Sequence, residues 1–277
     1  MTGVSGMDDP GSWGNLLEIA LDAAAAAARH IVEDRPRGPL EVTATKSSVT
    51  DIVTVMDQQA ERLVVERIRA GRPDDGFLGE EGAAVEGTSG VTWVIDPIDG
   101  TVNYLYGIPS YAVSVAARVG DQVVAGAVVN AVSGETWSAT RGRGAWLDGR
   151  PIRVNAAPEL AMALVATGFG YGVARRARQA RILGTVLPRV RDVRRAGAAS
   201  LDLCALACGR LDAFYEQGLQ PWDLAAGGLV AEEAGATVGG LQGRPAGEAM
   251  VLAAPPGLFD ELAALLAELA ADEMVEG

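Results

Sequence analysis

Apolar positions along the chain switch repeatedly between helical and strand-like spacing, which predicts a mixed α/β fold. An alanine-rich stretch over 13–32 has helical spacing, and a second helix is expected to end near Gly71, just before Arg72 and Pro73. We expect strands at 76–79, 92–95, 111–118 and 123–130, with shorter ones within 135–147. Further strands are expected at 162–167, 212–216 and 249–253, together with helices at 174–186, 199–208, 222–234 and 257–271.

The order of the expected elements changes near 150–158, where a strand-rich segment gives way to alternating strands and helices. This change predicts an N-terminal α+β lobe over about 12–152 and a C-terminal α/β lobe over about 153–270. A chain of 277 residues is long enough for a single domain made of two such lobes. We therefore expect one domain over 12–270, with flexible ends at 1–11 and 271–277.

Composition and charge narrow the class of function. The 36 acidic residues outnumber the 23 basic ones, and a net charge of −13 argues against a nucleic-acid partner. No apolar run is long enough to span a bilayer, and the first residues do not have the basic-then-apolar pattern of a signal peptide. Cys204 and Cys208 lie four residues apart in an apolar helical stretch, which predicts two reduced thiols. These features together predict a cytoplasmic protein without a membrane partner.

The segment 93–101 reads W-V-I-D-P-I-D-G-T and places two carboxylates, Asp96 and Asp99, at the end of a strand-like run. The proline and glycine predict a sharp turn, and Thr101 is a suitable cap for a helix that follows. Mg²⁺ prefers oxygen ligands, and a helix N-terminus offers free N–H groups to a phosphate. The segment therefore predicts metal ligands and an anion site side by side, with a simple acidic turn as the alternative.

Two other acidic segments allow a similar pair of interpretations. Glu80 and Glu81 follow the short strand expected at 76–79, although paired glutamates on a turn are often only solvated. Asp223 comes just after Pro221 at the start of an apolar helix, where the helix dipole alone would favour a carboxylate. Taken singly, neither segment decides between a functional and a structural role.

Taken together, these segments resemble the inositol monophosphatase family, within the Mg²⁺-dependent, lithium-sensitive sugar phosphatases. The resemblance rests on G-E-E at 79–81, W-V-I-D-P-I-D-G-T at 93–101 and W-D-L-A-A-G at 222–227. It extends to K-S-S at 46–48 with Asp51, Thr54 and Asp57, and to G-R-L-D-A-F-Y-E at 209–216. It covers nearly the whole chain, and T-G-F-G-Y-G at 167–172 is most similar to the bacterial branch.

The resemblance implies a layered αβαβα sandwich and a phosphomonoesterase that acts with two or three Mg²⁺ ions. The metal ligands that it implies are Glu80, Asp96, the backbone carbonyl of Ile98, Asp99 and Asp223. Chemically, an ester dianion must be neutralised before a nucleophile can approach it, and Mg²⁺ held by carboxylates meets that need. The family resemblance also implies a homodimer and inhibition by Li⁺.

The resemblance further assigns catalytic roles to Glu80, Thr101 and Asp57. Glu80 would hold the ion that carries the nucleophilic water, while the Thr101 hydroxyl, oriented by Asp57, would position or deprotonate that water. Lys46 would offset the negative charge of the carboxylates. The alternatives are that Thr101 is only a helix cap, Asp57 an ordinary first-turn carboxylate, and Lys46 a solvated loop residue.

The expected substrate is a small phosphate ester. The substrate contacts that the resemblance implies are Asp99, Gly100, Thr101, Gly197, Ala198, Ala199, Glu216 and Asp223. A carboxylate such as Glu216 accepts hydrogen bonds from vicinal hydroxyls, which favours inositol monophosphate or a related polyol phosphate. Ala198 stands where animal members usually carry threonine, and the neighbouring Arg194 or Arg195 is either a surface charge or a contact for a second anionic group.

Several alternatives stay open at this point. Relatives within the superfamily hydrolyse histidinol phosphate, fructose bisphosphate or adenosine bisphosphate, and a non-catalytic regulatory protein is an alternative of another class. Covalent catalysis through histidine or cysteine is not expected. The single histidine, His30, lies in the first helix away from the motifs, and neither cysteine lies in a phosphate-binding loop. Direct attack by a water molecule is therefore the predicted chemistry.

Overall fold

The computed structural model describes residues 13–35, 44–45, 52–53 and 55–273. Lys46, Asp51 and Thr54, which the family resemblance connects with the site, lie outside the described residues. None of the helices in the described ranges combines the length and the apolar character that a membrane crossing needs.

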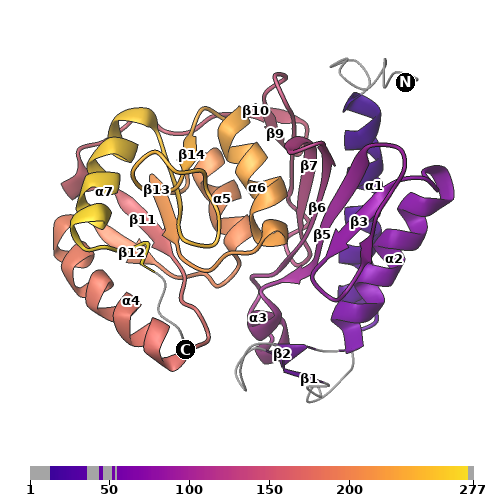
Figure 1. Cartoon of the computed structure of the whole chain (residues 1–277), viewed down its shortest axis with the longest axis horizontal. Coiled ribbons are helices and arrows are strands. Elements are labelled where there is room, and N and C mark those ends of the chain that lie inside the picture. The colour runs from indigo at the N-terminus through magenta and orange to yellow at the C-terminus, as the bar shows by residue number, and fades with distance from the viewer. Residues whose placement is uncertain (1–12, 36–43, 46–51, 54, 274–277) are drawn as a thin grey trace.

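The N-terminal half is built on an eight-stranded sheet with the order β10-β9-β8-β7-β6-β5-β3-β4 (Figure 1). Its strands are β3 (Gly76–Gly79), β4 (Ala84–Val85), β5 (Val91–Asp99), β6 (Ala112–Val119), β7 (Gln122–Asn130), β8 (Thr136–Thr140), β9 (Ala145–Leu147) and β10 (Arg150–Ile152). All neighbours in this sheet are antiparallel except β3 and β5, which are parallel. Helices α1 (Trp13–Glu33) and α2 (Val55–Gly71) pack on one face, and β1 (Ala44–Thr45) pairs with β2 (Ile52–Val53) separately.

The C-terminal half contains a five-stranded sheet with the order β12-β11-β13-β15-β14. Its strands are β11 (Leu164–Thr167), β12 (Asp192–Arg194), β13 (Ala213–Glu216), β14 (Thr237–Gly239) and β15 (Val251–Ala254). Its helices are α4 (Val173–Val186), α5 (Ala199–Ala207), α6 (Pro221–Glu233) and α7 (Pro256–Glu268). The remaining elements are α3 (Thr101–Tyr106) and two 3₁₀ turns, Leu160–Met162 and Leu187–Arg189.

The two sheets and three helix pairs are stacked in five layers (Figure 1). Helices α1 and α2 cover the outer face of the large sheet, α5 and α6 lie between the sheets, and α4 and α7 cover the outer face of the small sheet. This arrangement confirms the αβαβα sandwich that the family resemblance implied.

Helix α1 shows how the sequence pattern produces this packing. Its buried residues include Leu16, Ala20, Ala23, Ala27 and Ile31, which recur every three or four positions and so form one apolar face. Small alanine side chains let the helix axis come close to β6 and β7, where this face is removed from water. The helix predicted at 13–32 is therefore confirmed to within one residue at its end.

A glycine sets the distance between the middle helix layer and the large sheet. A Cβ atom on Gly126 of β7 would lie 3.0 Å from the Cα atom of Ala226 in α6, which is tighter than most Cβ contacts in proteins. The absence of a side chain at Gly126 thus allows α6 to lie directly on β7. Helix α6 carries Asp223 in its first turn, so this contact places a residue of the C-terminal half over the sheet that carries Asp96.

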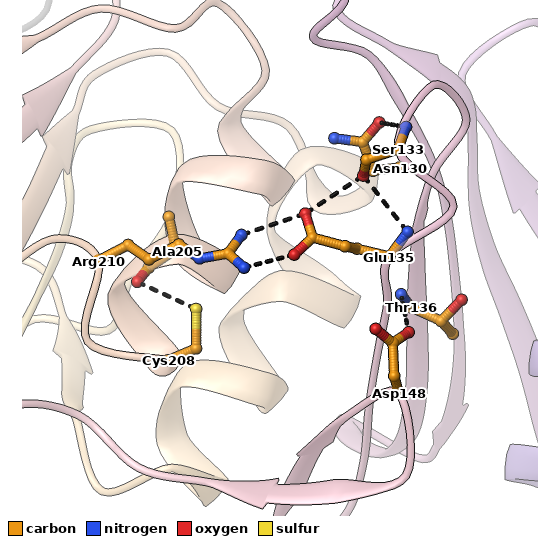
Figure 2. Close-up of polar contacts among 8 residues, drawn as sticks. All are labelled: Asn130, Ser133, Glu135, Thr136, Asp148, Ala205, Cys208 and Arg210. Atoms are coloured by element: carbon orange, nitrogen blue, oxygen red, sulfur yellow. Dashed lines mark hydrogen bonds and ion pairs between the residues drawn. The ribbon is translucent and has the colours of Figure 1, made fainter.

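An ion pair between Arg210 and Glu135 also joins the two halves of the molecule. Figure 2 shows the Arg210 guanidinium, which follows α5, forming two contacts with the carboxylate of Glu135 between β7 and β8. Glu135 Oε2, one of the two oxygens that Arg210 contacts, also accepts a hydrogen bond from the Ser133 hydroxyl at 3.2 Å. The same guanidinium lies 5.6 Å from the ring centre of Trp137, which adds a cation–π contact.

The structure corrects the expected course of the chain at 96–101. The turn predicted at Pro97 is wrong, because β5 continues through Pro97 to Asp99 with a register shift against β6. The reversal comes at Gly100, whose φ of 94° a glycine adopts without strain. Gly100 is also the N-cap of α3, so the prediction that Thr101 caps the helix is wrong.

Two further details differ from the sequence prediction. Ala271 and Asp272, the first residues of the tail expected to be loose, are only 2% and 8% exposed. The Arg178 guanidinium holds this segment by donating to the Ala270 carbonyl and pairing with Glu273. Cys204 is buried in α5 as expected, but Cys208 follows the end of that helix and is only half-buried; both are free thiols.

Candidate active site

A cavity of about 690 Å³ lies between the two halves of the molecule, and its walls come from segments far apart in the sequence. The large sheet contributes the ends of β3 and β5, and the C-terminal half contributes the loop after β11, the loop after β13 and the starts of α5 and α6. The cavity contains the following residues predicted from the sequence: Glu80, Asp96, Ile98, Asp99, Gly100, Thr101, Gly197, Ala198, Ala199, Glu216 and Asp223. The fold therefore brings the dispersed motifs to one place.

The irregular end of β5 sets the direction of the Asp96 and Asp99 side chains. Asp96 pairs with Ser114 of β6 and Asp99 with Ala112, so β5 has one residue more than β6 between these two pairs. Such a bulge changes the direction of side chains and is often found beside functional sites. The Ile98 amide donates to Asp96 Oδ1 at 3.1 Å, and both aspartates are buried, with exposed fractions of 1% and 7%.

Glu80 sits on a tight turn that Glu61 of α2 holds in place. The amides of Glu81 and Ala83 donate to the two carboxylate oxygens of Glu61 at 2.8 and 2.9 Å. A Cβ atom on Gly79 would lie only 2.2 Å from Glu61 Oε2, so the glycine makes room for this carboxylate. Glu61 was not predicted from the sequence; its place one helical turn after Asp57 was the only signal available.

Burial and the neighbouring carboxylates together raise the pKa of Asp96. Burial raises the pKa of Asp96 well above its ordinary value, and the negative charges of Glu80, Asp99 and Asp223 raise it further. A hydrogen bond with Glu80 acts in the same direction. A group of neighbouring acids, with Asp96 and Asp99 buried and only oxygen atoms as ligands, is the type of donor set that a hard cation such as Mg²⁺ prefers.

The donor set fits a divalent cation by its chemistry, since its members offer carboxylate oxygens to one cavity. Within the described part of the chain, no three His, Cys, Asp or Glu side chains yet have the arrangement that would hold an ion. Asp96 is hydrogen-bonded to Glu80, and Asp99 is hydrogen-bonded to the start of α5. Cation binding would thus require these carboxylates to turn toward a common point.

Asp99 links the large sheet to helix α5. Its Oδ1 accepts a hydrogen bond from the Ala199 amide at 3.2 Å, and its Oδ2 accepts from the Ser200 amide at 2.7 Å and hydroxyl at 2.5 Å. Burial raises the pKa of Asp99, while the hydrogen bonds from Ser200 and Ala199 act in the opposite direction. The segment predicted to contact substrate, 197–199, is therefore joined directly to a predicted metal ligand.

Thr101 and Asp57 form a pair, as the family resemblance predicted. The Thr101 Oγ1 atom lies 3.1 Å from Asp57 Oδ1 and 3.0 Å from the Ile98 carbonyl oxygen. A hydroxyl has one hydrogen, so it donates to one of these acceptors at a time. Asp57 is fully buried in the first turn of α2, which fixes the carboxylate behind the threonine.

Asp223 and Glu216 reach the cavity from the C-terminal half. Asp223 is the third residue of α6, and its carboxylate accepts a hydrogen bond from the Gln220 amide at 2.7 Å in a capping box. Glu216 ends β13 and fits against Gly168, where a Cβ atom would lie 2.1 Å from its Oε1. Burial raises the pKa of Glu216 to about 8, with added repulsion from Asp223 and Asp202 and an opposing effect of Arg195.

Sequence reasoning missed Asp202 and Arg175, which also line the cavity. Burial raises the pKa of Asp202 to about 7, the charge of Asp99 adds to the rise, and Arg195 opposes it. In the sequence Asp202 is only an acid in the first turn of a helix, and Arg175 is one of several arginines on α4. Nothing in the local pattern separates them from surface charges.

These raised pKa values predict that the protein without bound cations loses stability between pH 5 and pH 8. The folded Asp202 and Glu216 carboxyls keep their protons up to about pH 7 and 8, whereas the unfolded chain has released them by pH 5. The contribution of these two groups to the free energy of unfolding is therefore largest at low pH. It is lost as the pH rises through the pKa values that the two groups have in the folded protein. We expect the melting temperature in a chelator to be lower at pH 8 by on the order of 5 °C.

Calorimetry or circular dichroism at the two pH values checks this expectation. Mg²⁺ should reduce the difference because a cation offsets the ionised carboxylates, and Asp202→Asn should reduce it without Mg²⁺. Asp121→Asn, at an exposed position, is the matched control. A melting temperature that rises from pH 5 to pH 8 in the chelator would count against the acidic cluster described here.

Comparison with known proteins agrees with this geometry. A family model described as the inositol monophosphatase family matches residues 13–272. A protein of Mycobacterium bovis named inositol-1-monophosphatase is 54% identical over 231 residues, which is 80% of each chain. A Vibrio cholerae protein named Nus factor SuhB is 38% identical over 225 residues, 80% of this chain and 84% of that one.

Solved structures show the same fold. The crystal structure of the extragenic suppressor protein suhB from Bartonella henselae matches with a TM-score of 0.86 and 34% identity, covering 91% of this chain and 98% of that one.

Proposed function

Because the chain belongs to the inositol monophosphatase family and is a hydrolase of phosphoric monoesters, we propose that it hydrolyses inositol monophosphate or a related polyol phosphate. The observation that carries this proposal is that Glu80, Asp96, Asp99, Asp223 and Thr101 line one cavity, which Glu216 also lines. The first group suits a phosphate and its cations, and Glu216 suits the hydroxyls of the same substrate.

The proposed cofactor is Mg²⁺, with two or three ions. Glu80, Asp96, the Ile98 carbonyl, Asp99 and Asp223 would hold them. Bound Mg²⁺ would neutralise the ester dianion and make a water molecule more acidic. Glu61 supports this arrangement by holding the turn that carries Glu80, since its two oxygens bind the amides on the far side of that turn.

Thr101 and Asp57 would act on the attacking water. When the Thr101 hydroxyl donates its hydrogen to Asp57, its lone pairs are free to accept a hydrogen bond from a water in the cavity. This hydrogen bond would orient the water toward the phosphorus. As the P–O bond to the water forms and the ester P–O bond breaks, the proton of the water would pass to Thr101 Oγ1 and the hydrogen of that hydroxyl to Asp57, while the leaving alkoxide would take a proton from a second water. The amides of Gly100 and Thr101, at the start of α3, would bind the phosphate oxygens.

Substrate recognition would come from the C-terminal half. The hydroxyls of the polyol would bind to the Glu216 carboxylate, and the segment 197–199 would bound the ring on the side of α5. Arg195 opposes the rise in the pKa of Glu216, which favours the ionised, hydrogen-bond-accepting form. Ions bound nearby would act in the same direction.

The variant Glu216→Gln tests this assignment. We expect kcat/KM for myo-inositol 1-phosphate to fall on the order of 10- to 100-fold, because a hydrogen bond to a charged group is lost. An aryl phosphate without vicinal hydroxyls should change little. Glu261→Gln, on the exposed side of α7, is the matched control.

A selective loss on the polyol ester supports the proposal. An equal, large loss on both esters would instead place Glu216 in the metal-binding apparatus, and no loss on either would leave Glu216 without a role in substrate binding.

A second candidate function is non-catalytic regulation, favoured by the relative named Nus factor SuhB. Against it stands the complete set of acidic residues, since a protein that had lost catalysis would have no need to keep four carboxylates together with two of them, Asp96 and Asp99, buried. A panel of phosphate esters separates the alternatives, with histidinol phosphate, fructose 1,6-bisphosphate and an adenosine bisphosphate beside inositol phosphate. Turnover of another ester would change the substrate assignment, and turnover of none would favour regulation.

A further inference from the structure

One side-chain amide joins the two halves of the molecule beside the cavity. Asn103 of α3 is only 5% exposed, and its Nδ2 donates to the Ser110 carbonyl at 2.7 Å and to the Ala196 carbonyl at 2.8 Å. Ser110 belongs to the N-terminal half, whereas Ala196 lies between β12 and α5 of the C-terminal half. We propose that Asn103 is a positioning residue, which holds the segment 195–199 in place as one wall of the cavity. The part of this inference that concerns substrate binding rests on the proposed function.

Asn103 is itself fixed within the N-terminal half. A side-chain amide nitrogen carries two hydrogens, and here each hydrogen has a carbonyl acceptor. The Ile108 amide donates to the Asn103 carbonyl, and the Ser110 amide donates to the Ile108 carbonyl, both at 2.8 Å. The loop after α3 is thus folded back on Asn103, so the donor that meets Ala196 has a defined position.

Two glycines let the joined segments come close to each other. A Cβ atom on Gly100 would lie 3.0 Å from the Ser110 carbonyl oxygen and 3.2 Å from the Gly197 carbonyl oxygen. A Cβ atom on Gly197 would lie 3.1 Å from Asn103 Nδ2, and the φ of 90° at Gly197 also favours glycine. Gly100 and Gly197 both line the cavity. The Asn103 amide therefore sets the distance between two parts of the cavity wall that come from opposite halves.

The segment 195–199 needs a contact from outside to keep one conformation. It follows β12, a three-residue strand at the edge of the small sheet, and it leads into α5. Arg195 and Ala196 are exposed, so packing holds them weakly. Gly197 has the greatest conformational freedom of any residue type. The hydrogen bond from Asn103 to Ala196 restrains the chain at this point.

Asp99 supplies a second contact to the same segment, but it has another proposed role. Its carboxylate accepts hydrogen bonds from the Ala199 amide and from the amide and hydroxyl of Ser200. Asp99 is also a proposed ligand of Mg²⁺, so its oxygens would be shared between the cation and these donors. The Asn103 amide nitrogen has no part in the proposed metal site. We therefore expect the contact of Asn103 to hold the segment whether or not a cation is bound.

Hydrogen–deuterium exchange tests this contact without any substrate. Asn103→Leu keeps the approximate size of the side chain and removes both donated hydrogen bonds. The amides of residues 195–200 should then exchange on the order of 10-fold faster than in the wild-type protein, with Mg²⁺ and without it. Asn155→Leu is the matched control, because Asn155 Nδ2 also donates two hydrogen bonds, to the Gly209 carbonyl and to Asp212 Oδ1, away from the cavity. This control should leave the exchange of residues 195–200 unchanged.

Steady-state kinetics connects the contact with substrate binding. For myo-inositol 1-phosphate with Mg²⁺, Asn103→Leu should raise KM on the order of 10-fold and change kcat by less than about threefold, because the wall contacts the substrate both before and during the reaction. Asn155→Leu should keep the wild-type KM. A residue that only stabilised the fold would lower the melting temperature without changing the KM of the folded protein.

The variant Asn103→Asp gives a second measurement if Asn103→Leu does not fold, as judged by circular dichroism. It keeps the shape of the side chain and replaces the donating nitrogen with an oxygen that repels the two carbonyls, so exchange and KM should both rise. Unchanged exchange or an unchanged KM in a folded Asn103 variant would overturn the inference, as would failure of both variants to fold, while hydrolysis of myo-inositol 1-phosphate by the wild type still supported the proposed function. Absence of hydrolysis of every polyol phosphate by the wild type would overturn the proposed function, and with it the role of Asn103 in substrate binding.

Discussion

Replacing Asp96 with asparagine should lower kcat/KM for phosphate esters by more than about 100-fold while the protein stays folded. Residues that only orient metal ligands already account for 10- to 100-fold effects, and Asp96 lies among three other carboxylates at the centre of the cluster. The substitution keeps the shape of the side chain and removes a buried charge whose pKa is raised by that burial. The protein without bound cations should therefore be at least as stable as the wild type at pH 8.

Two measurements separate loss of the cation site from loss of the fold. Circular dichroism should show an unchanged spectrum, and calorimetric titration with Mg²⁺ should show weaker binding than in the wild type. Asp121→Asn is the matched control, since it makes the same chemical change at an exposed position. Near-normal turnover by Asp96→Asn at ordinary Mg²⁺ concentrations would refute the assignment of Asp96 to the metal site.

Replacing Thr101 with valine should have the second-largest effect. The side chain keeps its branched shape and loses the hydroxyl that lies 3.1 Å from Asp57 Oδ1. If that hydroxyl passes on the proton of the attacking water, kcat should fall on the order of 10²- to 10⁴-fold. The affinity for Mg²⁺, measured by calorimetric titration, should change much less, because the threonine hydroxyl is not among the proposed ligands.

A double-mutant cycle with Asp57→Asn tests whether the two residues act as a unit. Both single variants and the double variant should lose similar amounts of activity, since removal of either member disables the pair. Losses that add in free energy would show that Thr101 and Asp57 act independently. A small effect of Thr101→Val would leave the hydroxyl with a structural role only.

The main elements could be predicted from the sequence for a physical reason, and the motif residues that the family resemblance brought together do line one cavity. Helix α1 has a clear helical periodicity with one buried face. Strands β3 and β7 are short, mostly buried runs of apolar and glycine residues, and β7 is covered by α1 on one face and by α6 on the other. The short strands β12 and β14 were missed, because three-residue segments have too little periodicity and are stabilised by their neighbours in the sheet.

The error around Pro97 has a different origin. Proline and glycine are reliable turn signals when only local conformation matters. Here β5 lies between β3 and β6 in the sheet, and the bulge between Asp96 and Asp99 accommodates the proline without ending the strand. Pairing within the sheet thus overrode the local preference, and the reversal was delayed to Gly100.

The residues missed at the site act through contacts that are distant in sequence. Glu61 meets the turn after β3 from α2, and Asp99 meets Ser200 across 101 positions. Arg175 is distinguished from the other arginines of α4 only by Gly170 and Gly218, where a Cβ atom would meet its side chain. Such relations depend on how the layers are stacked, so they become visible only in three dimensions.

We propose that the acidic cluster forms a cation-dependent phosphatase centre for polyol phosphates. The most direct measurement is phosphate release from myo-inositol 1-phosphate by protein first treated with a chelator and then titrated with Mg²⁺. We expect no measurable phosphate release in the chelator, and a rate of phosphate release that rises to saturation as Mg²⁺ is added. Release that is unaffected by the chelator, or no release at any Mg²⁺ concentration, would contradict it.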